Sequence, residues 1–126
     1  MKLSELQPEW VNYSGEGRFR RYRDSHSQID YGSGEMADPP EESEVIALAD
    51  GLIFLCPTCF KKNNGVVGTE SVLCWFAGKS HIPADAKPGP GRWTATGTSF
   101  HDLTLSPSVN VNKEHWHGFI KKGEIT

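Results

Sequence analysis

The sequence predicts a mainly β protein, built as a small antiparallel sheet stack or a partly open barrel. Three observations favour this fold class. The 13 glycines and 8 prolines in 126 residues place frequent turns along the chain. Short apolar runs recur between these turns, and no helical pattern of ten or more residues appears. The length fits one compact domain, and a hydrophobic content of 37% indicates that part of the chain is irregular or extended.

The chain divides into two parts of different composition. Residues 1–43 are expected to form an extended N-terminal arm followed by a flexible loop, because 25–43 is rich in Gly, Ser, Pro and acidic residues and contains the breaker Pro39-Pro40-Glu41-Glu42. Residues 44–126 are expected to form the β-rich domain, which carries the apolar runs.

Within that domain, Leu52–Leu55 is predicted to be a buried strand, and Val66–Phe76 is the longest strand candidate. The segment Phe60–Gly65 is predicted to be a turn. Further short strands are expected at Trp93–Thr96, Leu103–Leu105, Ser108–Val111 and Trp116–Ile120.

Cys56-Pro57-Thr58-Cys59 is the sharpest chemical signal, because two cysteines with a two-residue spacer can direct both sulfurs at one ion about 2.3 Å away. We expect a zinc knuckle (Zn²⁺) here. A redox dithiol is the main alternative. It is disfavoured because thioredoxin-like pairs lie at a strand-to-helix junction, and a turn, not a helix, is predicted after Cys59. Inert thiols are the third interpretation.

Two histidines late in the chain are the expected partners of this pair. His115 and His117 are two residues apart on a predicted strand, so their imidazoles share a face while Trp116 lies on the other. A metal site of Cys56, Cys59, His115 and His117 is coordinatively closed, which is typical of structural zinc. It would also stabilise a small domain with a thin core.

Other side chains are open alternatives for the remaining positions. They are Glu70, Glu114, Cys74, His81 and His101. If a coordination position stayed open, Glu70 or Glu114 could act as a general base. Cys74 alternates with apolar neighbours and is better interpreted as a small core residue. His81 and His101 fit surface loops.

The charge pattern gives little support for binding to nucleic acid. The net charge is −3, and the one exception is a run in which Arg18, Arg20, Arg21 and Arg23 alternate with aromatic residues. Such a run can contact phosphates and stack on bases, but an edge strand with solvated arginines is the favoured interpretation. No apolar run approaches the roughly 20 residues of a membrane span, and no export signal is visible. We expect a soluble, cytoplasmic protein.

Several motifs together resemble one family of small phage, prophage and bacterial proteins that are sometimes labelled ammonia monooxygenase. The matching stretches are Asp50–Cys59, Val72–Phe76, Pro88–Trp93, Gly97–Thr98, Leu103–Ser108 and Trp116–Ile120. The resemblance covers Gly51–Ile125 and implies zinc binding through three cysteines or mixed Cys/His ligands. Two positions depart from it. Glu70 stands where the family has histidine, and Glu114 stands where it has cysteine. The resemblance then implies that His115 replaces the missing cysteine.

These observations lead to one expected function and two alternatives. The favoured expectation is a small zinc-binding module of phage or prophage type, with a structural metal and a protein partner, acting in inhibition or assembly in the host cytoplasm. The first alternative is a zinc-dependent hydrolase with Glu70 or Glu114 as base. The second is a nucleic-acid binder.

Overall fold

The computed structural model describes residues 1–15, 18–22, 48–87, 91–110 and 116–126. These residues form a mainly β protein of small antiparallel sheets, and no closed barrel occurs among them. Within the described ranges, two short helices, η1 (Leu3–Leu6) and α2 (Pro57–Asn63), accompany ten strands. The strands are β1 (Glu9–Gly15), β2 (Arg18–Tyr22), β3 (Gly51–Leu55), β4 (Ser71–Trp75), β5 (Thr94–Thr96), β6 (Thr104–Ser106), β7 (Val109–Asn110), β8 (His117–Gly118), β9 (Ile120–Lys121) and β10 (Glu124–Ile125).

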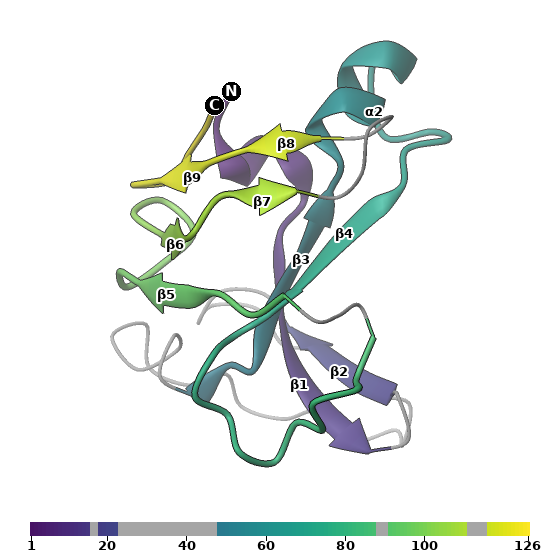
Figure 1. Ribbon diagram of the computed structural model, residues 1–126. Coiled ribbons are helices and arrows are strands. Elements are labelled where there is room, and N and C mark those ends of the chain that lie inside the picture. The colour runs from purple at the N-terminus through teal and green to yellow at the C-terminus, as the bar shows by residue number, and fades with distance from the viewer. Residues whose placement is uncertain (16–17, 23–47, 88–90, 111–115) are drawn as a thin grey trace.

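The largest sheet has four antiparallel strands in the order β2-β1-β3-β4 (Figure 1). β3 lies inside it, paired with β1 on one side and with β4 on the other, and all five of its residues are buried. Gly51 opens this strand because a Cβ there would lie 2.6 Å from the carbonyl oxygen of Cys74 on β4. Only glycine allows the two backbones to approach so closely.

The two faces of this sheet are covered by different parts of the chain. Alternate residues of a strand point to opposite faces, so the sheet contributes to two core clusters. The larger cluster joins one face to the C-terminal half: Trp10, Leu52, Phe54, Cys74 and Phe76 pack with Leu103, Leu105, Val109, Trp116 and Ile120. On the other face, the smaller cluster joins Val11, Ile53 and Trp75 to Ile82 and Ala86 of the β4–β5 connection.

The C-terminal half consists of three two-stranded ladders, β5-β6, β7-β8 and β9-β10. The last ladder brings the two ends of the chain side by side (Figure 1), because Lys2 forms an isolated bridge with Glu124 and the Ile125 N–H donates to the Met1 carbonyl at 2.8 Å. The C-terminal residues therefore close the large core cluster against η1 and β1.

The expected fold class is confirmed, and the described residues of the segment expected to be an arm, 1–15 and 18–22, contribute strands to the main sheet. Leu3, Leu6 and Trp10 are fully buried, and β1 and β2 supply half of the main sheet. β1 pairs with β3 about 40 residues later in the chain, and a pairing over this separation leaves no local pattern in the sequence. The expected boundary near residue 43 and the flexible loop at 25–43 lie outside the described residues.

Two predicted elements have different limits in the structure. The strand expected at Val66–Phe76 begins only at Ser71, because the Thr69 N–H donates to the Val66 carbonyl at 3.0 Å and closes a turn. The turn expected at Phe60–Gly65 is wrong: Pro57–Asn63 forms α2, and Asn64 ends it in a left-handed conformation. A helix of seven residues is too short to give a readable periodic pattern.

Candidate metal centre

Cys56 lies at the point where β3 ends and α2 begins. It occupies the N-cap position with an extended backbone, and Pro57 follows inside the first turn, where its missing N–H costs nothing. The Cys56 N–H donates to the Glu70 carbonyl at 2.7 Å, and its carbonyl accepts the Phe60 N–H at 2.8 Å. The backbone of Cys56 is therefore fixed on both sides by the sheet and the helix.

The spacing of the motif places the second cysteine one helical turn away. Cys59 is the third residue of α2, and its sulfur is hydrogen-bonded to that of Cys56. Neither cysteine is in a disulfide. Cys56 is 1% exposed, whereas Cys59 is half-buried and packs against the large core cluster. Two soft donors thus meet at the end of a rigid strand.

Burial and backbone hydrogen bonds act in opposite directions on the Cys56 thiol. Burial raises its pKa and is the dominant cause, while the N–H groups of Cys59 and Thr58 lower it by donating to the sulfur. The raised pKa favours the protonated thiol over the thiolate. A soft metal ion favours the thiolate and would reverse this preference.

The strand-to-helix junction removes the argument that disfavoured a redox dithiol. A turn was expected after Cys59, but α2 continues to Asn63. The junction is the place where redox-active cysteine pairs lie, and it is equally suited to a metal knuckle. The local fold alone therefore does not separate the two chemistries.

The predicted histidine ligands are only partly described. His115 lies outside the described residues. His117 begins β8 opposite Asn110, is exposed, and its Nε2 lies 3.4 Å from the Ser108 Oγ. Trp116 is buried on the opposite side, so the predicted alternation of these two residues is confirmed. Trp116 stacks edge-on against Phe54 of β3, with ring centroids 5.9 Å apart.

The described residues supply two metal donors at this place and no complete site. Among them, no group of three or more His, Cys, Asp or Glu side chains is arranged to hold a metal ion. The thiol pair fits a soft metal by its chemistry. Since His115 is outside the described ranges, the four-residue ligand set stays a prediction.

The other candidate metal ligands lie in different environments or outside the described residues. Glu70 is exposed, and its carbonyl accepts the Cys56 N–H, so the backbone at this position adjoins the thiol pair. Glu114 lies outside the described residues. Cys74 is fully buried, and burial raises the pKa of its thiol to about 12. This matches the interpretation of Cys74 as a core residue. His101 is exposed at a turn beside Asp102.

The arginine run lies on β2, an outer strand of the main sheet. Arg18 and Arg20 are exposed, and Arg21 forms an ion pair with Glu9. Arg23 is not among the described residues. Phe19 packs edge-on against Trp75, with centroids 6.0 Å apart, and Tyr22 is buried. Both aromatic rings of β2 are thus engaged within the fold, which weakens the case for stacking on bases.

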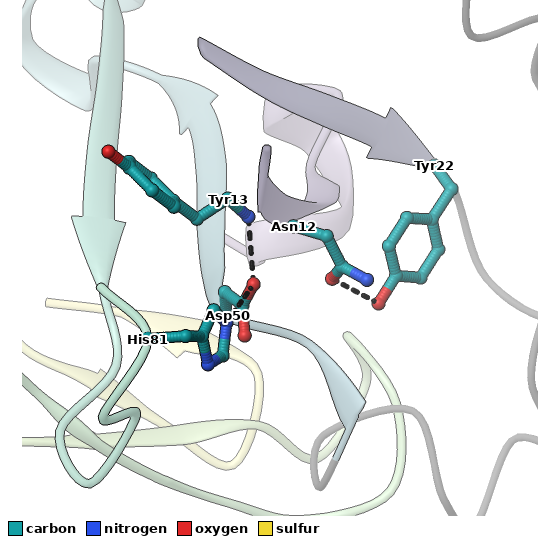
Figure 2. A network of polar contacts seen from close by, with 5 residues as sticks. All are labelled: Asn12, Tyr13, Tyr22, Asp50 and His81. Carbon is teal, nitrogen blue, oxygen red and sulfur yellow. Dashed lines mark hydrogen bonds and ion pairs between the residues drawn. The ribbon is translucent and has the colours of Figure 1, made fainter. Parts of the chain in front are cut away.

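A second polar centre lies at the opposite end of β3 and was not predicted. The Asp50 carboxylate accepts the Tyr13 N–H at 2.7 Å and contacts the His81 Nε2 at 2.8 Å, and Figure 2 shows these groups converging. The Asp50 side chain is 6% exposed and that of His81 is 54% exposed. The sequence indicated only a surface loop at His81, since no local signal reports a contact between residues so far apart.

Comparisons with protein-family models, with curated proteins and with solved structures gave no match to this chain. Within the described residues, no helix has the length and apolar character required to cross a membrane.

Proposed function

We propose that this protein is a small zinc-binding interaction module, in which Cys56 and Cys59 supply two thiolates to a structural metal. One observation carries the proposal: two thiols, hydrogen-bonded to each other, occupy the N-cap and third positions of α2 at the end of a fully buried strand. A preorganised pair of soft donors favours zinc over hard cations such as Mg²⁺ or Ca²⁺.

The expected remaining ligands come from the segment around Trp116. Trp116 contacts Phe54 of β3, which precedes Cys56 by two residues, and His115 is the neighbour of Trp116 in the sequence. His117 is engaged with Ser108 through Nε2, so Nδ1 is the nitrogen left for a metal. A ligating imidazole commonly uses its second nitrogen for such an outer hydrogen bond. Whichever histidine binds, the metal would tie the C-terminal half to the main sheet.

Exposed apolar residues next to α2 support a protein partner. Val66 is 45% exposed and Val67 is 90% exposed in the turn that follows the helix, and Lys61 and Lys62 lie in the last helical turn. An adjacent pair of exposed valines beside two cations suits an apolar and acidic protein surface. The metal would fix the position of this helix and its turn, which fits a structural role.

Metal analysis of the full-length protein tests the proposal. Protein purified under reducing conditions from zinc-supplemented cells should contain about one zinc per chain by mass spectrometry of the elements. Cys56→Ser and Cys59→Ser should lose it. Cys74→Ala is the matched control and should retain zinc, since that thiol belongs to the core. Fully reduced, folded wild-type protein that neither contains zinc nor competes for it with a chromogenic chelator would contradict the proposal.

A zinc-dependent hydrolase is the second candidate, favoured by the hydrogen bond that keeps Glu70 beside Cys56. If the metal had an open position, it would supply Lewis-acid chemistry, and the Glu70 carboxylate would take a proton from the attacking water. Zinc-loaded protein should then hydrolyse activated esters or peptides. Glu70→Gln should reduce the rate at least tenfold while metal content is unchanged. Equal rates in both proteins would exclude this role.

A further inference from the structure

The three cysteines differ strongly in their access to solvent. Cys74 is fully buried inside β4, and Cys56 is 1% exposed. Cys59 is half-buried, and its neighbour Thr58 is exposed. A dissolved molecule can therefore reach Cys59, while the other two sulfurs are behind the protein surface.

The pair also has the spacing that a disulfide requires. Cys56 and Cys59 are three residues apart across the first turn of α2, and residues at this spacing have neighbouring side chains on a helix. Their sulfurs are in hydrogen-bond contact. A disulfide needs Cβ atoms about 3.5–4.5 Å apart, and two cysteines whose sulfurs are in contact are close enough to be candidates for such a bond.

We propose that Cys56 and Cys59 form a thiol–disulfide exchange site, in which Cys59 reacts with a small external disulfide and the buried Cys56 resolves the mixed disulfide. In the first step the Cys59 thiolate attacks one sulfur of the external disulfide, the S–S bond breaks, and one thiolate leaves and is protonated. In the second, the Cys56 thiol gives up its proton, its sulfur attacks the Cys59 sulfur, and the second thiolate is expelled and takes up a proton. The pair is oxidised to a disulfide, and one external disulfide is reduced to two thiols.

The roles of the two cysteines follow from their burial. The buried Cys56 cannot meet an external disulfide, but it lies beside the Cys59 sulfur, which is the atom it would attack. The second cysteine of the motif is therefore the attacking one and the first is the resolving one, which is the reverse of a pair whose first cysteine is exposed. The external disulfide must enter from the side of Cys59 and Thr58, where the helix surface is open.

The charge beside Cys59 indicates the class of disulfide. Lys62 is exposed three residues after Cys59, so its ammonium lies on the same side of the helix. A cation at this place attracts an anionic reactant. An anionic disulfide such as oxidised glutathione should therefore react faster than the cationic disulfide cystamine, and Lys62→Glu should reverse the order.

Exchange can be measured on full-length, metal-free protein in glutathione buffers, with acid quenching, alkylation and peptide mass spectrometry. Wild type should form a Cys56–Cys59 disulfide. Cys56→Ser should accumulate one glutathione on Cys59, and Cys59→Ser should react at least tenfold more slowly. Cys74→Ala is the control and should behave like wild type. No Cys56–Cys59 disulfide at any glutathione ratio, or faster reaction of Cys59→Ser than of Cys56→Ser, would overturn the proposal.

A second measurement covers the case in which a variant does not fold, which rapid alkylation of Cys74 would reveal. In the reduced wild-type protein, a limiting amount of iodoacetamide should modify Cys59 first, and modification of Cys56 first would overturn the assignment. The proposal shares its residues with the zinc site but does not depend on metal. Zinc binding is measured on reduced protein and exchange on metal-free protein, so either can fail alone.

Discussion

The two ends of β3 carry polar centres of opposite character. At its start, the Asp50 carboxylate accepts a hydrogen bond from the Tyr13 backbone and contacts His81, and its own N–H and carbonyl bond to Val11 and Phe76. At its end, the backbone of Cys56 is held just as firmly. The side chains there are two adjacent thiols, which are weak hydrogen-bonding groups but strong ligands and nucleophiles.

This difference separates a structural contact from a functional one. The Asp50 network connects β1, β3 and the β4–β5 connection. The Asp50 carboxylate uses its capacity to accept hydrogen bonds within the fold. The thiol pair is positioned by the same strand, but backbone hydrogen bonds hold it there. The sulfurs therefore stay available for metal coordination or disulfide exchange. Loss of the first centre should therefore affect stability, and loss of the second should affect chemistry.

Removal of the Asp50 carboxylate should have the largest effect on stability. Asp50→Ala leaves the Tyr13 N–H without its acceptor and detaches His81, which should lower the free energy of unfolding by about 2–3 kcal/mol. Asp50→Asn keeps an acceptor oxygen and should cost about 1 kcal/mol. Urea denaturation followed by tryptophan fluorescence measures both. A variant Asp50→Ala as stable as wild type would show that this network does not fasten the sheet.

Loss of the histidine partner should have a smaller and more local effect. The His81 side chain is half exposed, so solvent screens its interaction with Asp50, and His81→Ala should cost about 1 kcal/mol. Amide hydrogen exchange should accelerate in the β4–β5 connection around Ile82 and Ala86, which cover Trp75. Hydrogen exchange that accelerates equally in all strands would show that the Asp50–His81 contact does not act locally.

Removal of a thiol should change stability little when no metal is present. Cys59 is only half-buried, so Cys59→Ala in the presence of a chelator should change the free energy of unfolding by less than about 1 kcal/mol. Its thermal midpoint should lie within a few degrees of that of wild type. A much larger loss of unfolding free energy without metal would mean that Cys59 is a packing residue. The two ends of β3 would then not differ in their contribution to stability.

The exposed Asp102 carboxylate should have the smallest effect on stability. The N–H groups of Thr98 and Ser99 donate to Asp102 at 2.8 Å and lower the pKa of its carboxyl. The stabilisation is therefore present above the ordinary aspartate pKa and is lost as the pH falls through the lower folded-state value. The difference in melting temperature between wild type and Asp102→Asn should be small at pH 7 and should narrow towards pH 3. A difference that widens on acidification would contradict this sign.

Local patterns predicted those parts of the molecule that depend on neighbouring residues. The buried strand before Cys56, the burial of Cys74 and the opposite faces of Trp116 and His117 follow from apolar runs and strand alternation. Helix α2 escaped prediction because seven residues give no periodic signal, although Pro57 and the Asn64-Gly65 pair mark its two ends.

The remaining features depend on pairings between distant residues. The place of β1 and β2 in the main sheet requires a contact across the long polar segment, and the Asp50–His81 pair joins a strand to a loop 31 positions later. Neither contact leaves a mark in the local sequence, since register and long-range packing are decided by the whole core. The thiol pair was found because its two members are close in the chain.

The most direct test of the account is the zinc dependence of stability in reduced protein. At a free zinc concentration 100-fold above the dissociation constant, the wild-type protein should gain about 2.7 kcal/mol in its free energy of unfolding. Cys74→Ala should gain the same, and Cys59→Ala should gain nothing. An equal response of Cys59→Ala and wild type to zinc, or no response of either, would contradict the assignment of Cys56 and Cys59 as the metal-binding pair.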